Sequence, residues 1–139
     1  MAITKLVAVV SNTSPAAAST VAGTTTVNIS DLAWFQVYLD VQGATGGALD
    51  VYIQSRYGSL WVDWYHHPQM AAAAGSEKRV IVPESTSIVS TVGVDLVPAL
   101  ASGACVGGKP GDALRLCFVA GAGTSAGAAQ VMRVIGFKS

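Results

Sequence analysis

The segment Leu49–Tyr65 constrains the fold most strongly, because apolar and polar residues alternate on both sides of a single glycine, Gly58. Alternation with a period of two residues around a turn is typical of a β-hairpin with one buried face. If Tyr57 and Gly58 form the two-residue loop, each face of the hairpin keeps one consistent character. This register predicts the opposed pairs Arg56–Ser59, Gln54–Trp61, Tyr52–Asp63, Asp50–Tyr65, Ile53–Val62 and Val51–Trp64. The segment therefore predicts a β-sheet that packs on one side.

The rest of the chain divides into short segments rich in β-branched and aromatic residues, separated by Gly, Pro, Ser and Asn clusters. The predicted strands are Ile3–Val10, Thr24–Ile29, Ala33–Gln42, Ala48–Arg56, Ser59–His66, Glu77–Val82, Ser87–Val92, Asp112–Ala120 and Gln130–Phe137. Helix is expected only as a single turn within Met70–Ala74. This pattern predicts one all-β domain, an antiparallel β-sandwich or jelly roll.

The N-terminal region differs from the rest in composition. Ser11–Thr26 contains one large aliphatic residue, Val21, and no aromatic or charged residue, so it cannot drive its own collapse. We therefore expect residues 1–26 to form an N-terminal strand and flexible arm, and residues 27–139 to form the β-sandwich domain. Ile3–Val10 is expected to pair with a sheet of its own chain or of a neighbour, since an exposed apolar edge is a liability. The arm is expected to serve assembly more than the fold.

The charge content points away from nucleic acid as a partner. Charged residues make up 12 % of the chain, about half the ~25 % of an ordinary domain. Lys and Arg together number 8 and so do Asp and Glu, which gives a net charge of zero and no phosphate-binding surface. Hydrophobic residues reach 51 %, so we expect a partner to cover part of the surface.

The apolar runs and the cysteines indicate where the chain is made. Leu6–Val10 is shorter than the ~7–15 residues of a signal-peptide core, and no run reaches the ~18 residues of a membrane helix. We therefore expect cytoplasmic synthesis and no membrane partner. Cys105 and Cys117 are expected to be free thiols, and a bridge between them is the alternative.

Three segments imitate catalytic or cofactor motifs without their required context. Gly103–Lys109 spells most of a phosphate-binding loop, but Pro110 replaces the Ser or Thr, and a strand is predicted to follow. Gly121–Ala126 imitates a dinucleotide fingerprint but is better interpreted as a connection between strands. His66 and His67 are adjacent on a strand and should point to opposite faces. We expect no enzymatic activity, no metal and no cofactor.

Aromatic side chains are the candidate binding residues. They fall on the strand faces opposite the aliphatic ones, at Trp34, Tyr38, Tyr52, Trp61 and Tyr65. If exposed, they form an interface for a partner, because Trp and Tyr give a large contact area at low entropic cost. The alternative is that both faces of a two-sheet sandwich, or its loops, bury these rings.

The hairpin Leu49–Trp64, with its Val-Tyr-Ile-Gln-Ser and Gly-Ser-Leu-Trp-Val-Asp core, resembles small virion proteins of tailed bacteriophages, as do Gly111–Phe118 and Val131–Phe137. The resemblance, which covers Leu49–Ser139, is to capsid decoration (cement) proteins. It implies a β-sandwich or jelly roll without enzymatic activity that associates as a dimer or trimer. It also implies that the protein binds the outer surface of an icosahedral head and clamps neighbouring major capsid protein subunits.

A second function fits the same fold class. The chain could be a glycan- or receptor-binding module of a phage appendage, with Trp34, Tyr52 and Trp61 as stacking platforms for sugar rings. The fold does not discriminate between the two functions, since β-sandwiches carry both.

Overall fold

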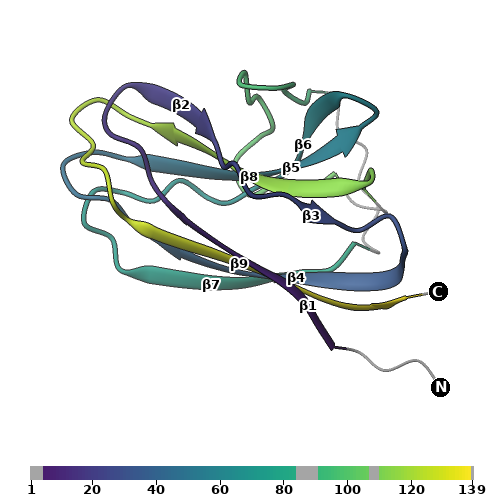
Figure 1. Cartoon of the computed structure of the whole chain (residues 1–139). Helices are drawn as coiled ribbons and strands as arrows, with labels where there is room; N and C mark the ends of the chain where they lie inside the picture. The colour runs from purple at the N-terminus through teal and green to yellow at the C-terminus, as the bar shows by residue number, and fades with distance from the viewer. Residues whose placement is uncertain (1–4, 84–90, 107–109, 139) are drawn as a thin grey trace.

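Two antiparallel sheets pack face to face in the computed structural model, which describes residues 5–83, 91–106 and 110–138 (Figure 1). The β4 sheet has the strand order β1 (Lys5–Thr13), β9 (Ala129–Lys138), β4 (Leu32–Gln42), β7 (Ser76–Ile81). The β5 sheet has the order β2 (Ser19–Ala22), β8 (Ala113–Ala120), β5 (Leu49–Tyr57), β6 (Leu60–His66), and β3 (Val27–Asn28) also pairs with β8. The prediction of an all-β antiparallel sandwich is confirmed. The finer jelly-roll topology stays a prediction.

The core lies between the sheets and follows from the period-two pattern. Alternate residues of β4, β5, β8 and β9 point inward and are almost completely buried. The inward set includes Phe35, Val37, Leu39, Val41, Leu49, Val51, Ile53, Leu114, Leu116, Phe118, Met132 and Val134. Burial of each such side chain contributes roughly 1.5–3 kcal/mol. The opposite, outward residues of the same strands are therefore the ones available for function.

The hairpin register differs from the predicted one by one residue in the turn. Gly58 and Ser59 form the loop, and Tyr57 pairs with Leu60. Gly58 has a φ of 67°, which suits the first central position of a type II′ turn. The predicted loop, Tyr57-Gly58, is therefore wrong, because the φ preference of glycine determines its position in the turn.

A β-bulge at Trp64 changes the register again further along β6. Gln54 pairs with Asp63 and Ile53 with Tyr65, so Trp64 is the extra residue on its strand. Trp64 and Tyr65 are consequently both buried in the core cluster. The turn shift alone makes all six predicted pairs wrong, since Arg56 pairs with Trp61 and Gln54 with Asp63. The bulge then moves the partner of Tyr52 one residue further, to His66.

Most of the other predicted elements are confirmed within a few residues. Thr24–Ile29 contracts to β3, and Met70–Ala74 contains no helix, since Met70 forms a bridge with Leu49. Of the predicted strand Ser87–Val92, residues 87–90 lie outside the described residues, and 91–92 are not in a strand.

The N-terminal region is part of both sheets. β1 pairs along its length with β9, and Val10 is only 1 % exposed in the core. The segment expected to be irregular, Ser11–Thr26, includes the end of β1 and all of β2, which pairs with β8. Ser14 is buried, and its N–H donates to the Ala128 carbonyl. Residues 5–26 therefore contact the sandwich closely, and deletion of residues 1–26 tests whether the domain needs them to fold.

Candidate functional site

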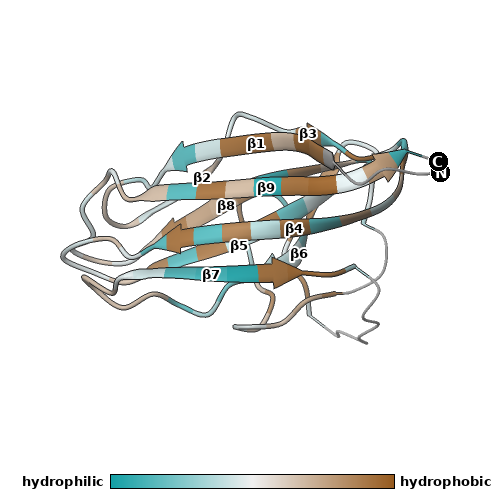
Figure 2. Cartoon of the chain, turned by 90° about the horizontal axis from the view of Figure 1, so that it is seen from below, coloured by the Kyte–Doolittle hydropathy of each residue, from teal (hydrophilic) through white to brown (hydrophobic). Residues whose placement is uncertain are grey.

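The outer face of the β4 sheet is uncovered and carries apolar side chains from all four strands. Figure 2 views the molecule from this side and shows hydrophobic bands along β1, β9 and β4 and at the end of β7. On the two edge strands Leu6 is 53 %, Val9 47 % and Val80 49 % exposed. In the middle, the rings of Trp34 and Phe137 stack with centroids 6.0 Å apart. An exposed apolar surface of this kind marks a binding site for a partner.

The charges on this face are few and partly paired. Asp40 on β4 lies 3.5 Å from Lys78 on β7. Arg133 on β9 lies between Tyr38 and Val9 in the strand pairing, with all three side chains on the outward face. The face therefore offers aromatic and aliphatic contact area with one cationic group near its centre, a composition enriched at protein interfaces.

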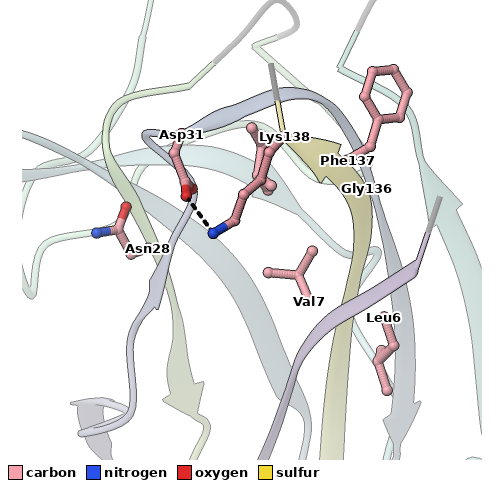
Figure 3. A pocket seen from close by; sticks show the side chains of 8 residues that line it. Leu6, Val7, Asn28, Asp31, Gly136, Phe137 and Lys138 are labelled. Carbon is pink, nitrogen blue, oxygen red and sulfur yellow. Dashed lines mark ion pairs between the residues drawn. The ribbon is translucent and has the colours of Figure 1, made fainter. Parts of the chain in front are cut away.

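A hollow lies at one end of this sheet, where β1 begins. It has a volume of about 430 Å³. Val7 points into it, and the ion pair between Asp31 and Lys138, 3.2 Å long, crosses its upper part (Figure 3). Both charged side chains are exposed, so this ion pair contributes little stability. The residues that line the hollow include no set of nucleophile, acid and base that would suggest catalysis.

The outer face of the β5 sheet is covered by the chain itself. Residues 91–106, the covering loop, lie over β5 and β6 and are held by the Asp63 carboxylate. Its Oδ2 accepts hydrogen bonds from the backbone N–H groups of Gly93, Ala99 and Leu100 at 2.8, 2.8 and 3.0 Å. Its Oδ1 accepts one from Gln54 Nε2 at 3.0 Å. A buried carboxylate with this many donors is fully satisfied and acts as a structural anchor.

His66 adds a second connection between the covering loop and the sheet. Its Nδ1 donates to the Leu100 carbonyl at 2.8 Å, and its Nε2 lies 2.9 Å from Asp50 Oδ1. Burial raises the pKa of Asp50, but hydrogen bonds from His66 and Gln69 outweigh it and leave the pKa below its ordinary value. The ring of Tyr52 stacks on His66 with centroids 3.9 Å apart. His66 therefore connects the covering loop, through Leu100, to Asp50 and Tyr52 on the sheet.

The structure separates the five predicted aromatic residues into two groups. Trp34 and Tyr38 lie together on the outer face of β4 and are half-buried. Tyr52, at 7 % exposure, is buried against His66, and burial together with nearby acidic groups raises its pKa to about 12. Tyr65, at 4 % exposure, belongs to the core because of the bulge at Trp64.

The fifth aromatic residue, Trp61, lies at the edge of the β5 sheet between two arginines. The guanidinium of Arg115 is 4.4 Å and that of Arg56 is 5.6 Å from the ring centroid. Both are cation–π distances. The predicted single interface of five aromatic residues is therefore divided between opposite sheets, and two of its members are buried.

Several residues of the exposed face were not predicted from the sequence. They are Leu6, Val9, Val80, Ile135 and Phe137. The signal that would have found them is present in the alternation of Val131–Phe137, where outward positions carry Ile and Phe instead of polar residues. Aliphatic residues at outward positions give a weaker signal than aromatic ones, because single exposed aliphatic side chains are common on protein surfaces.

The side chains with potential for chemistry are mostly buried. Cys105 and Cys117 are not joined by a disulfide, and burial raises the pKa of Cys117 to about 11. His67 is completely buried, its Nδ1 lies 2.8 Å from the Pro68 carbonyl, and burial lowers its pKa. Across residues 5–83, 91–106 and 110–138, no cluster of three or more His, Cys, Asp or Glu side chains is placed to hold a metal ion.

Comparison of the chain with protein-family models, with curated proteins and with solved structures finds no match. In the described ranges, no helix is long and apolar enough to cross a membrane.

Proposed function

We propose that this chain is a non-enzymatic structural protein that attaches to another protein through the outer face of the β4 sheet. The observation that carries the proposal is the asymmetry of the two sheets. The chain covers the outer face of its β5 sheet with its own loop, anchored by Asp63. It leaves the outer face of the β4 sheet open, with Leu6, Val9 and Val80 about half exposed. Such a face is stabilised when a partner removes it from water.

The partner we propose is the major capsid protein of a tailed phage. The resemblance of Leu49–Ser139 to decoration proteins suggests this partner, and the apolar, sparsely charged face supports it. In this role the protein would bind the outer surface of the head where capsid subunits meet. Each contact could be weak, because an icosahedral shell repeats it at many linked sites.

The glycan-binding alternative has less support. Of its three candidate platforms, Tyr52 is buried and its ring is already stacked on His66. The Trp61 ring is in contact with Arg115 and Arg56, which compete with a sugar for its faces. Trp34 remains, stacked with Phe137 on the face that we propose for protein binding.

Heads that lack the protein provide the test. Purified protein added to such heads should bind and raise the temperature at which the heads lose their DNA. Val80→Asp, on the exposed face, should abolish binding, since it places a charge in an apolar contact. Leu60→Asp is the matched control, because Leu60 is similarly exposed but belongs to the β5 sheet, and it should bind like the wild type. Equal binding of both variants, or no binding of the wild type, would contradict the proposal.

A further inference from the structure

The edges of the two sheets are not protected equally. In the described part of the chain, the β4 sheet ends in β1 and β7, and the β5 sheet ends in β2 and β6. The covering loop occupies the edge of β6 through backbone hydrogen bonds, among them Asp95 N–H to the Trp61 carbonyl at 2.8 Å. β7 carries the charges Glu77, Lys78 and Arg79, and β2 has only four residues. Loops, charges and shortness are the usual protections of an edge strand.

β1 has none of these protections over most of its length. It has nine residues, and from Leu6 to Thr13 it carries no charge. One bulge interrupts its pairing with β9, between Leu6 and Ala8. From Ala8 to Thr13 the strand is regular and has an open edge.

The direction of the free backbone groups follows from the pairing with β9. Ser14 N–H donates to the Ala128 carbonyl, so every second residue before it, back to Ala8, directs its N–H and C=O toward β9. The N–H and C=O groups of Val9, Ser11 and Thr13 therefore point to the open edge. Among the described residues, these groups have no hydrogen-bond partner. A row of free N–H and C=O groups of this kind forms regular hydrogen bonds with another extended strand.

We propose that this strand is β1 of a second copy of the chain, paired antiparallel across a two-fold axis. Pairing centred on Val10 places Val9 opposite the partner subunit's Ser11 and uses the open N–H and C=O groups of both strands. The paired segments, Ala8–Asn12 of each subunit, contain no charged residue, so no like charges face each other across the axis. The two β4 sheets become one continuous sheet, and the apolar face extends across both subunits.

A second copy is favoured over head-to-tail pairing of β1 with β7 for two reasons. Pairing with β7 would place Glu77, Lys78 and Arg79 beside an apolar strand. It would also generate an open filament, whereas a two-fold pairing closes and leaves no free edge on β1. The dimer does not depend on the proposed attachment to capsids, because it concerns an edge and not the face.

Analytical ultracentrifugation of the purified full chain tests the dimer. The wild type should sediment as a dimer at high concentration and dissociate on dilution. Ser11→Pro removes a backbone N–H that points to the open edge and leaves the bonds to β9 intact, so it should give a folded monomer. Val9→Lys should weaken the dimer as well, since each subunit gains a positive charge beside the axis. Val80→Lys is the matched control on the opposite edge strand, where exposure is 49 % against 47 % for Val9, and it should remain dimeric.

Two results would overturn the proposal. One is a wild-type chain that stays monomeric at every concentration. The other is a dimer that survives in folded Ser11→Pro. If Ser11→Pro does not fold, Val9→Lys decides the question, because a dimer of unchanged affinity in that variant contradicts pairing through β1. Since Val80→Lys alters the face proposed to bind capsids but not the β1 edge, failure of the dimer and failure of attachment are observed separately.

Discussion

The carboxylate of Asp63 and the backbone of Leu100 lie 37 residues apart in the chain and are joined by a 3.0 Å hydrogen bond inside the protein. This contact, with those to Gly93 and Ala99, determines which face of the sandwich is available. Where Asp63 holds the loop, the β5 sheet is covered. The β4 sheet has no equivalent anchor among the described residues.

Replacing Asp63 by Asn should destabilise the protein by about 2–4 kcal/mol, because an amide has one acceptor oxygen: if it faces the three backbone N–H groups, the N–H₂ faces the Nε2 donor of Gln54. Chemical denaturation measures the loss. Asp95→Asn is the control, since Asp95 is exposed in the same loop and its φ of 49° suits Asn. An unchanged free energy of unfolding in Asp63→Asn would show that the carboxylate does not anchor the loop.

Stability should fall as the pH decreases from 7 to 5, in part because of His67. Burial lowers the pKa of this histidine in the folded state, so below its ordinary value of 6.5 the unfolded chain takes up the proton more readily. The contribution of neutral His67 is complete above that pH and is lost as the pH falls toward the folded pKa. His67→Gln should flatten this part of the pH profile of the thermal midpoint. An identical slope in both proteins would rule out His67 as the cause.

Below pH 4 a different group should dominate. The pKa of Asp50 is lowered by His66 and Gln69 against the effect of burial, so its contribution to stability is present above the ordinary value of 3.8. It is lost as the pH falls from that value through the folded pKa. Asp50→Asn should therefore reduce the acid-dependent loss of stability in this range, measured by urea denaturation at a series of pH values. A steeper loss in the variant would contradict a lowered pKa for Asp50 in the folded state.

Gly111 should tolerate no side chain. A Cβ at this position would collide with the carbonyl of Arg56, whose oxygen also accepts the Asp112 N–H at 2.9 Å. We expect Gly111→Ala to cost about 1–3 kcal/mol. Gly75→Ala is the comparison, because nothing lies within 4 Å of the added carbon and the change should be neutral or slightly stabilising. Equal melting temperatures for the two variants would mean that the strand end at Gly111 adjusts freely.

Deletion of residues 1–26 should abolish cooperative unfolding. The deletion removes β1 and β2, one from each sheet, together with the core side chain of Val10. Circular dichroism during heating tests this. A sharp transition in the 27–139 chain would instead support the expectation from the sequence that this region is an arm used in assembly.

The strands could be predicted from the sequence wherever one face is buried. β4 was predicted within one residue, because Phe35, Val37, Leu39 and Val41 alternate with outward residues over its length. The position of β1 was harder to predict. Within Ile3–Val10, the run Leu6–Val10 is apolar on both faces, and nothing in its local pattern indicates which strand it pairs with.

The candidate site was only partly predictable. Trp34 and Tyr38 were placed on one outer face correctly, because side chains alternate between the two faces of the sheet along the whole of an uninterrupted strand. Tyr65 was misplaced because the extra residue at Trp64 turns the following side chain to the opposite face of the sheet. Bulges have no simple local signal in a sequence. Whether Tyr52 is exposed or buried was left open by its strand pattern, and its burial against His66 depends on how distant segments pack.

An image of a phage head carrying this protein tests the central claim most directly. Electron cryomicroscopy at side-chain resolution should place the outer face of the β4 sheet, with Trp34, Tyr38 and Val80, against the major capsid protein. The covering loop and Trp61 should face solvent. A head on which the β5 sheet makes the contact, or a head surface with no density for the chain, would contradict the proposal.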